Sequence, residues 1–208
     1  MGPLERLFAR ANPRILDRTE QVLITVLFVW LVYRVIESQN SYAPLLLISE
    51  AAVVIFTLIR RPTSDISLRL GDWLLAVTAT AAPLLIQPGL DIFPALAPLG
   101  VLLVLAGNVF QGLAKLSLRR SFGIAPANRG IKADGLYRFV RHPMYAGYLI
   151  VHIGVLILMP SVINFVIYAI GWWAQILRLR AEEELLSQDP AYVAFKEKVR
   201  YRLIPGLF

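Results

Sequence analysis

The 208-residue sequence contains no cysteine and only two histidines, His142 and His152. Without cysteine the chain forms no disulfide bond, thiolate nucleophile or cysteine-ligated metal site, and two histidines are too few for a histidine-rich metal cage. Charged residues are also scarce, at 17% of the chain against roughly 25% in soluble domains. So few charged residues could not cover a surface that is exposed to water on all sides. The sequence therefore predicts an integral membrane protein without a metal site.

Six apolar stretches are separated by short polar connections. A helix needs about 20 apolar residues, and at least about 17, to cross the hydrocarbon region of a bilayer, so the first, third and fifth stretches must include flanking residues. Short connections favour antiparallel neighbours in one bundle. The predicted fold is an all-α polytopic membrane bundle of about six transmembrane helices, over Val22–Ile36, Ala43–Ile59, Trp73–Gln87, Pro94–Ala114, Tyr145–Met159 and Val162–Leu177.

The distribution of Lys and Arg predicts the orientation of this bundle. With the amino terminus in the cytoplasm, the three outer connections contain no Lys or Arg, and every basic residue except Arg34 falls in an inner segment. This is the positive-inside pattern, so both termini are predicted to be cytoplasmic. The first nineteen residues hold four arginines and no apolar core, which argues against a cleaved signal peptide. The net charge of +7 is then interpreted as attraction to anionic lipids, and not to nucleic acid.

The longest polar stretch runs from Lys115 to Arg141 and is rich in Gly, Asn, Asp and Arg, so it is predicted to be a loop with one short turn. It leads into the segment RHPMYAGY. His142 precedes proline and is disfavoured inside a helix, whereas Pro143 suits a first helical turn. Arg141 and His142 are therefore predicted at the cytoplasmic amino terminus of the fifth helix, where helices attract anions.

The sixth predicted helix continues past the membrane into ILRLRAEEELLSQDP. Arg178 and Glu182 are four residues apart and are predicted to share a face. The pair Asp189-Pro190 predicts the cap and first position of another helix. In that last helix, apolar residues form a stripe on one face and basic residues lie on the other face, which is typical of an interfacial amphipathic helix. The stripe is Tyr192, Phe195 and Val199, and the basic residues are Lys196, Lys198 and Arg200.

Several polar residues lie inside the predicted spans. Asn108 and Gln111 are three residues apart, and this spacing fits either hydrogen bonds between helices or the lining of an acceptor channel. Glu50 and Arg34 are ionisable residues of the kind that mark functional sites in membranes, although we expect structural or snorkelling roles here. His152 is expected to be a hydrogen-bonded residue of the bundle.

Short motifs follow one another in a fixed order in the second half of the chain: Gly135-Leu136-Tyr137, the RHPMYAG of Arg141 to Gly147, Arg178 followed by Glu182-Glu183 and Leu186, Tyr192 with Phe195, and Ile204-Pro205-Gly206. Together they resemble the isoprenylcysteine carboxyl methyltransferase family, which is itself similar to the phospholipid N-methyltransferases. Phe195 stands where the family usually has a second tyrosine. The resemblance covers roughly residues 115–208, a methyltransferase-like region, and leaves residues 1–114 as the four amino-terminal transmembrane helices.

The resemblance implies that the chain binds S-adenosylmethionine and transfers its methyl group. It implies catalytic roles for Arg178, Glu182 and Glu183, with Arg178 facing the acceptor. An in-line displacement at a methyl carbon needs alignment above all, and a dry channel strengthens its electrostatics. The cofactor-binding residues that the resemblance implies are Arg129, Gly130, Ile131, Lys132, Tyr137, Arg141, His142, Pro143, Met144, Tyr145 and Glu182.

The expected function is methyl transfer from S-adenosylmethionine to a lipophilic acceptor at the cytoplasmic membrane face. The acceptor would be an isoprenylcysteine-type carboxylate, a phospholipid amine or another small lipophilic nucleophile, and membrane lipids would be the other partners. The expected location is the bacterial inner membrane, or the endoplasmic reticulum in a eukaryote. Two alternatives are an NADPH-dependent membrane reductase of the sterol-reductase type and a non-enzymatic transporter or sensor. Neither the acceptor nor the oligomeric state follows from the sequence.

Overall fold

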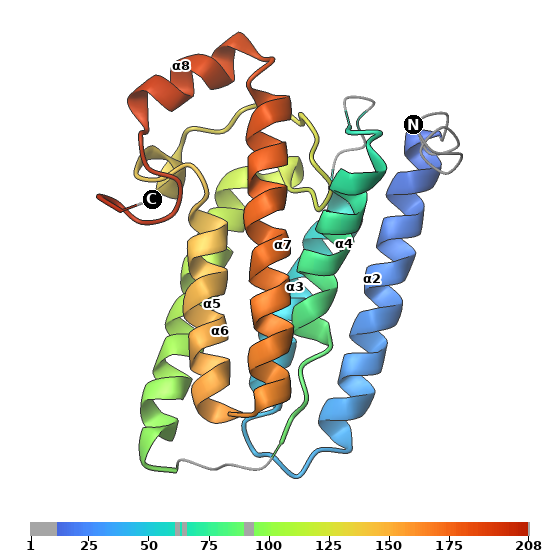
Figure 1. The fold of residues 1–208 in the computed structure, drawn as a ribbon, viewed down its shortest axis with the longest axis vertical. Coiled ribbons are helices and arrows are strands. Elements are labelled where there is room, and N and C mark those ends of the chain that lie inside the picture. The colour runs from blue at the N-terminus through green and yellow to red at the C-terminus, as the bar shows by residue number, and fades with distance from the viewer. Residues whose placement is uncertain (1–11, 61–62, 64–65, 90–93, 208) are drawn as a thin grey trace.

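The computed structural model describes residues 12–60, 63, 66–89 and 94–207, and this part of the chain is all-helical (Figure 1). Its one β-type pairing is an isolated bridge between Ile66 and Ala127. The all-α class is therefore confirmed. Predictions about residues 1–11 and Arg61 fall outside the described residues. The α-helices are α2 (Pro13–Ile36), α3 (Pro44–Ile59), α4 (Leu70–Leu84), α5 (Ala97–Leu118), α6 (Pro143–Leu158), α7 (Val162–Leu186) and α8 (Pro190–Lys198).

Consecutive helices from α2 to α7 run up and down the long axis of the molecule (Figure 1). Helix α6 packs chiefly against α5, and α7 packs chiefly against α4. The start of α2, the loop between α5 and α6, the end of α7 and all of α8 lie at the same end of the bundle. We call it the loop end. The antiparallel order predicted from the short connections is thus confirmed.

Three helical segments are long and apolar enough to cross a membrane, namely Arg14–Ile36, Pro94–Leu118 and Val162–Leu186. The apolar helices α3, α4 and α6 have only 15 or 16 residues, which corresponds to about 24 Å at 1.5 Å per residue. Large apolar side chains face outward along the bundle, as at Leu102 and Trp173, which are 62% and 63% exposed. An apolar exterior is what a lipid environment requires. The number of membrane crossings stays a prediction.

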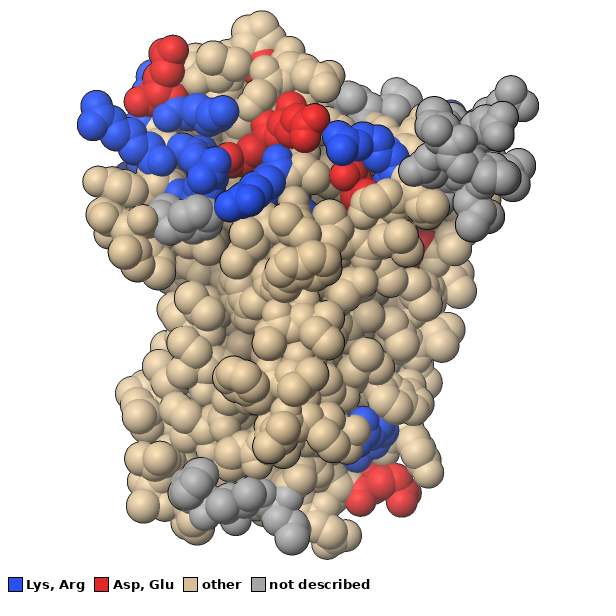
Figure 2. Space-filling view, in the orientation of Figure 1, with Lys and Arg blue, Asp and Glu red and all other residues tan. Residues whose placement is uncertain are grey.

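Charged side chains gather at the loop end (Figure 2). On the face shown, a wide band free of Lys, Arg, Asp and Glu separates them from one small charged group at the other end. Helix α2 ends there, with Arg34 in its last turn and Glu37 as its C-cap. Arg34 lies 4.9 Å from the ring centroid of Trp30, a cation–π contact that keeps its charge near the end of the helix.

Glycines allow α5 and α6 to approach very closely. A Cβ atom added to Gly147 of α6 would lie 2.7 Å from the Cβ and 2.8 Å from the backbone nitrogen of Gln111 on α5. A Cβ added to Gly154 would lie 2.8 Å from the Gly100 carbonyl oxygen. Close backbone contact through small residues is a common way for helices to associate in membranes, where burial of apolar surface contributes little.

We therefore expect Gly147→Ala to lower the free energy of unfolding in detergent by about 1–3 kcal/mol, because the new methyl group meets backbone that cannot move aside. Gly112→Ala on α5 is the matched control, since nothing lies within 4 Å of its added Cβ. The control should be neutral or slightly stabilising, as alanine favours helix more than glycine does. Equal melting temperatures for the two variants would contradict this account of the interface.

A buried polar network links α5 to α3. The Ser49 hydroxyl donates to Asn108 Oδ1 at 2.7 Å, and Gln111 Nε2 donates to the Ser49 hydroxyl at 3.0 Å. Of the two roles predicted for Asn108 and Gln111, these bonds support interhelical contact. Lys115, predicted to belong to the polar inner loop, instead lies in the last turn of α5 and is fully buried, with Nζ donating to Gln111 Oε1 at 2.7 Å. Lys115 lies one helical turn after Gln111, so its long side chain can reach the Gln111 amide oxygen. This hydrogen bond allows Lys115 to be buried in the helix instead of lying in the polar loop.

Helix α8 begins as predicted and lies across the loop end (Figure 1). Asp189 is its N-cap, with the carboxylate accepting from Ala191 N at 2.9 Å, and Pro190 is the first helical residue. Tyr192, Phe195 and Val199 are all buried in a core cluster of the protein. The apolar stripe predicted to meet lipid therefore packs onto the protein itself, where it covers the loop between α5 and α6.

Candidate active site: two adjoining cavities

The loop between α5 and α6 contains two short 3-10 helices, Arg119–Ser121 and Gly135–Arg138, where the sequence predicted one turn. It is bound to other parts of the chain. Ser67 N donates to Pro126 O at 2.9 Å, and Asn128 Nδ2 donates to Asp189 Oδ2 at 2.9 Å. The loop is thus held between the segment before α4 and the start of α8, which gives it a fixed shape.

The amino terminus of α6 is held by the chain that follows α8. His142 is the N-cap and Pro143 the first helical residue, as predicted. The backbone N–H groups of Arg141 and His142 donate to the carbonyl oxygens of Tyr201 and Arg202 at 2.9 and 2.8 Å. Residues 60 positions apart in sequence therefore meet at the helix entrance, and the last segment of the chain is part of the site.

Glu183 is the centre of a buried ionic cluster at this entrance. Its Oε1 accepts from Arg141 Nε at 2.7 Å and lies 3.2 Å from His142 Nε2, while its Oε2 accepts from Arg202 Nε at 2.9 Å. Glu183 is 5% exposed and lines neither of the cavities described below. Its contacts are those of a carboxylate that holds α6, α7 and the carboxyl-terminal segment together.

A cavity opens beside this entrance, under the loop and α8. We call it the loop-side cavity. Tyr145 and Glu182 meet there, since the Tyr145 hydroxyl donates to Glu182 Oε2 at 2.8 Å. Pro143 is buried but is not among the residues that line the cavity. The other ten predicted cofactor residues line it: Arg129, Gly130, Ile131, Lys132, Tyr137, Arg141, His142, Met144, Tyr145 and Glu182.

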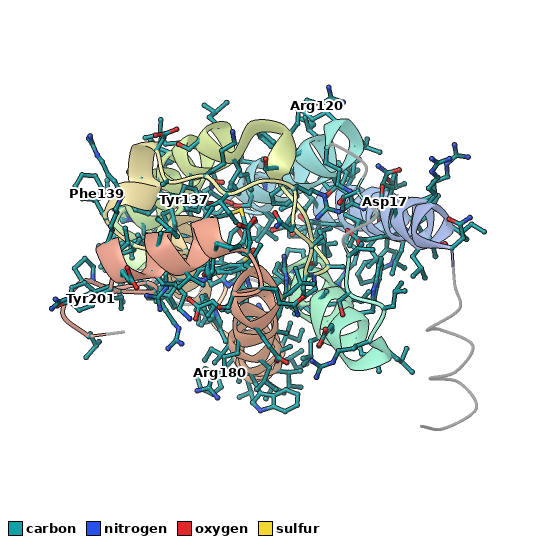
Figure 3. The ribbon with its side chains drawn as sticks, turned by 90° about the horizontal axis from the view of Figure 1, so that it is seen from above. Asp17, Arg120, Tyr137, Phe139, Arg180 and Tyr201 are labelled. Carbon is teal, nitrogen blue, oxygen red and sulfur yellow. The ribbon has the colours of Figure 1, made fainter. Side chains whose placement is uncertain are left out.

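The view from above the loop end shows the labelled Tyr137 inside the outline of the molecule, whereas Phe139 and Arg180 lie toward its rim (Figure 3). Tyr137 is 7% exposed, and burial raises its pKa well above the ordinary value for tyrosine. Burial together with the nearby Glu183 carboxylate likewise raises the pKa of Tyr192. Both phenols therefore remain neutral, so that each offers a hydroxyl and an apolar ring to a ligand.

The loop-side cavity combines the donors and acceptors that an amino-acid-bearing nucleoside needs. Arg129, Lys132 and Arg141 suit a carboxylate, and Glu182 suits an ammonium or ribose hydroxyl group. Met144 and Phe195 supply apolar surface for a base or a sulfonium carbon chain. The residues present therefore fit S-adenosylmethionine.

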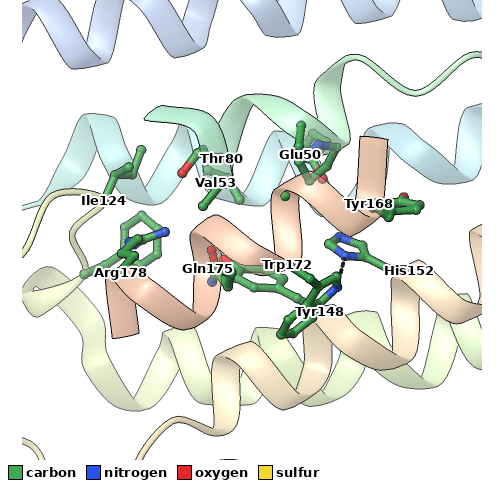
Figure 4. Close-up of a pocket in the computed structure, with 15 residues that line it drawn as sticks. Glu50, Val53, Thr80, Ile124, Tyr148, His152, Tyr168, Trp172, Gln175 and Arg178 are labelled. Carbon is green, nitrogen blue, oxygen red and sulfur yellow. Dashed lines mark hydrogen bonds between the residues drawn. The ribbon is translucent and has the colours of Figure 1, made fainter. Parts of the chain in front are cut away.

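A second cavity lies among α3, α4, α6 and α7 (Figure 4). We call it the span-side cavity. It extends along α7 from Tyr168 to Arg178, ten residues or about 15 Å along the helix axis. Its lining is mainly apolar, with a few polar groups. His152 Nδ1 accepts from Trp172 Nε1 at 3.0 Å, so the prediction that His152 is a hydrogen-bonded bundle residue is confirmed.

The two cavities share a thin wall. Phe122 and Ile124 line the span-side cavity, while Gly123 between them lines the loop-side cavity. Arg178 Nη2 donates to the Gly123 carbonyl oxygen at 3.1 Å, and the guanidinium carbon lies 5.4 Å from the ring centroid of Tyr145. A ligand in one cavity therefore lies beside a ligand in the other, with Arg178 at their junction.

Two buried donors at this junction have no hydrogen-bond acceptor among the described residues, Nε of Arg178 and Nε2 of Gln175. Both side chains line the span-side cavity. A buried donor without an acceptor is costly unless a ligand or water supplies one. Arg178 and Glu182, predicted to share a helix face, form no ion pair with each other in the described part of the chain, because Glu182 is bound to Tyr145 and Arg178 to the loop.

The sequence did not indicate one part of the site, a buried ionic cluster that joins α2 and α3 to the loop. Arg60 Nη2 lies 2.6 Å from Asp17 Oδ1, and Arg60 Nη1 lies 2.5 Å from Glu20 Oε1. Arg129 Nη2 lies 3.5 Å from Asp17 Oδ1. The sequence predicts no role for Asp17 or Glu20, because a contact between helices far apart in sequence gives no local pattern that could have identified it.

We expect Asp17→Asn to weaken binding of S-adenosylhomocysteine about 3- to 10-fold, because it removes the charge that orients Arg129 at the cavity. Isothermal titration measures the affinity. Glu37→Gln is the matched control, since it makes the same change of charge beyond the carboxyl end of α2. An unchanged affinity in Asp17→Asn would mean that the amino-terminal helices do not support the loop-side cavity.

Comparison with known proteins gives matches in the same region. Residues 101–188 match the model of the isoprenylcysteine carboxyl methyltransferase family, whose members are integral membrane methyltransferases that use S-adenosylmethionine. Protein-S-isoprenylcysteine O-methyltransferases A and B of Arabidopsis thaliana are 26% and 25% identical over 136 and 134 residues. Each match covers 61% of this chain and 68% of the relative. The resemblance carried by the motifs is confirmed.

Proposed function

We propose that the chain, which is similar to the isoprenylcysteine carboxyl methyltransferase family over residues 101–188, methylates a lipophilic acceptor whose reactive group is a carboxylate, as in an isoprenylcysteine. The observation that carries this proposal is the shared wall between the two cavities. One cavity has the polar groups that suit the methyl donor, and the other is apolar and ends at a buried arginine. A donor and a lipid can therefore occupy adjoining sites.

The loop-side cavity would hold the cofactor. S-adenosylmethionine bound there would supply an electrophilic methyl group on its sulfonium, to be transferred to the acceptor's carboxylate oxygen, with S-adenosylhomocysteine as the leaving group. Tyr145 and Glu182 would bind its polar groups beside the wall, with Lys132 available to its carboxylate. Their fixed positions supply alignment, which is the main requirement of this reaction.

Arg178 and Gln175 would bind the acceptor carboxylate from the span-side cavity. Their unsatisfied buried donors face the junction from α7, one turn apart. A carboxylate that is already ionised needs no general base, so these residues position and desolvate the nucleophile and take no proton from it. Glu183, expected to be catalytic, would act through Arg141 and His142 as a positioning residue.

The expected topology follows from the arrangement of charges. We propose six crossings with the loop end in the cytoplasm, since basic residues gather there and the apolar exterior continues along all six helices. Residues 1–114 would then form four spans and residues 115–208 the cofactor-binding region. A bacterial inner membrane or the endoplasmic reticulum would each place the loop-side cavity in contact with the cytosolic cofactor pool.

Incubation of the purified protein with methyl-labelled S-adenosylmethionine and an S-prenylated N-acetylcysteine tests the proposal. We expect a base-labile methyl ester, and binding of S-adenosylhomocysteine but not of NADPH by calorimetry. A phosphatidylethanolamine vesicle tests the amine acceptor in parallel. Binding of NADPH without binding of S-adenosylhomocysteine would overturn the proposal in favour of a reductase.

A further inference from the structure

Glu50 lies in the span-side cavity, although an apolar chain in that cavity would have no use for a carboxyl group. It is on α3, is 7% exposed and lines the cavity together with Tyr168 and His152 (Figure 4). In the close-up it lies toward the Tyr168 end and away from Arg178. The cavity therefore has a polar group at each end of an apolar passage.

No described residue donates a hydrogen bond to the Glu50 carboxyl group within the bundle. Lys115 is the basic group whose charge acts on Glu50, but its ammonium donates to Gln111 Oε1 at 2.7 Å and lies 5.1 Å from the ring centroid of Tyr148. The nearby charge offsets part of the cost of burial, while the acceptor capacity of the carboxyl group is left for something in the cavity. Buried polar groups are normally hydrogen-bonded, so a ligand is the natural partner.

We propose that Glu50 determines acceptor specificity by accepting a hydrogen bond from a hydroxyl group on the acceptor's apolar chain. This inference rests on the proposed function and narrows its substrate class. The acceptor is then an amphiphile with a carboxylate at the Arg178 end and a hydroxyl group deeper in the cavity, within the roughly 15 Å that separates Arg178 from Tyr168 along α7. A plain hydrocarbon chain would leave Glu50 desolvated without a partner, which lowers its affinity.

A neutral donor suits this position better than a cation. Lys115 already supplies a positive charge close to Glu50 in a region of low dielectric constant, where a second ammonium group would be repelled. Tyr148 and Tyr168, which line the same cavity, offer ring surface beside the carboxyl group and no further negative charge. The ligand group that fits is therefore a hydroxyl.

A matched pair of acceptors tests the proposal: N-acetyl-S-decylcysteine and its chain-end alcohol, N-acetyl-S-(10-hydroxydecyl)cysteine. Binding is followed by intrinsic fluorescence, because Trp172 lines the cavity, and methyl transfer is measured separately. We expect the wild-type protein to bind the alcohol about 10-fold more tightly, the upper range of one net hydrogen bond. Glu50→Leu should reverse the preference, and Glu50→Gln, which keeps size and one acceptor oxygen, should fall between them.

Binding of S-adenosylhomocysteine should be the same in all three proteins, since Glu50 does not line the loop-side cavity. An equal or stronger affinity of the wild type for the decyl compound, or an unchanged preference in both variants, would overturn the inference. If both compounds are methylated without preference, the inference fails and the proposed function stands. If the alcohol is preferred in binding but neither compound is methylated, the inference stands and the proposed function fails.

Discussion

Replacement of Arg178 by leucine should lower kcat/KM for the acceptor by about 10²- to 10³-fold, the usual loss when one charged donor is removed from a reacting centre. Arg178 is 4% exposed and lies at the junction of the two cavities, so its charge is poorly screened where the carboxylate must react. Arg178→Lys should retain part of the activity, because it keeps the charge but loses the planar fork that a carboxylate matches.

The affinity for S-adenosylhomocysteine separates this role from a structural one. Arg178 lines the span-side cavity, so the affinity should change less than about threefold in Arg178→Leu, the range of one peripheral contact. Arg180→Leu is the matched control, since Arg180 is an exposed residue of the same helix. A variant Arg178→Leu that loses cofactor binding yet methylates normally at saturating cofactor would show that Arg178 serves the loop and not the acceptor.

Replacement of Glu183 by glutamine should destabilise the protein by about 3–5 kcal/mol, the range found when one partner of a buried ionic cluster is removed. Arg141 and Arg202 would lose the carboxylate that both hold, and the start of α6 would lose its connection to α7. Because Arg141 and His142 line the loop-side cavity, affinity for S-adenosylhomocysteine should fall in parallel with the melting temperature.

Glu184→Gln is the control for this change on the adjacent residue. The Glu184 side chain is 68% exposed and pairs with the equally exposed Arg69 at 3.2 Å, a surface contact that contributes at most about 1 kcal/mol. Its stability and cofactor affinity should match the wild type. A Glu183→Gln protein with normal stability and cofactor affinity but no methyl transfer would instead restore the catalytic role first expected for Glu183.

The family resemblance carried by the motifs of the second half implied eleven cofactor residues, and ten of them line the loop-side cavity. The motifs are local: RHPMY marks a helix start, and Arg178 and Glu182 lie on one helix, so each motif keeps its residues close together. Glu183 shows the limit of that reasoning. The motif includes it, but only the folded chain reveals that it binds Arg202 from the carboxyl-terminal segment and lines neither cavity.

The span-side cavity could not be predicted in the same way. Its residues come from four helices, and their meeting depends on how the helices pack. Glu50 and Arg60 were expected to be structural or surface charges, since a single charged residue in a span does not say what lies opposite it. Lys115 was misplaced for the same reason, because the end of an apolar stretch does not determine where a helix ends.

The wall of residues 122–124 constrains how such a protein can diversify. Gly123 lines the loop-side cavity, whereas Phe122 and Ile124 line the span-side cavity. A substitution in this wall would therefore alter the binding of both the methyl donor and the acceptor. Substitutions in α3 and α4 can change acceptor binding more easily, because these two helices line the span-side cavity and not the loop-side cavity. Residues 101–188, where the family match lies, exclude both of these helices.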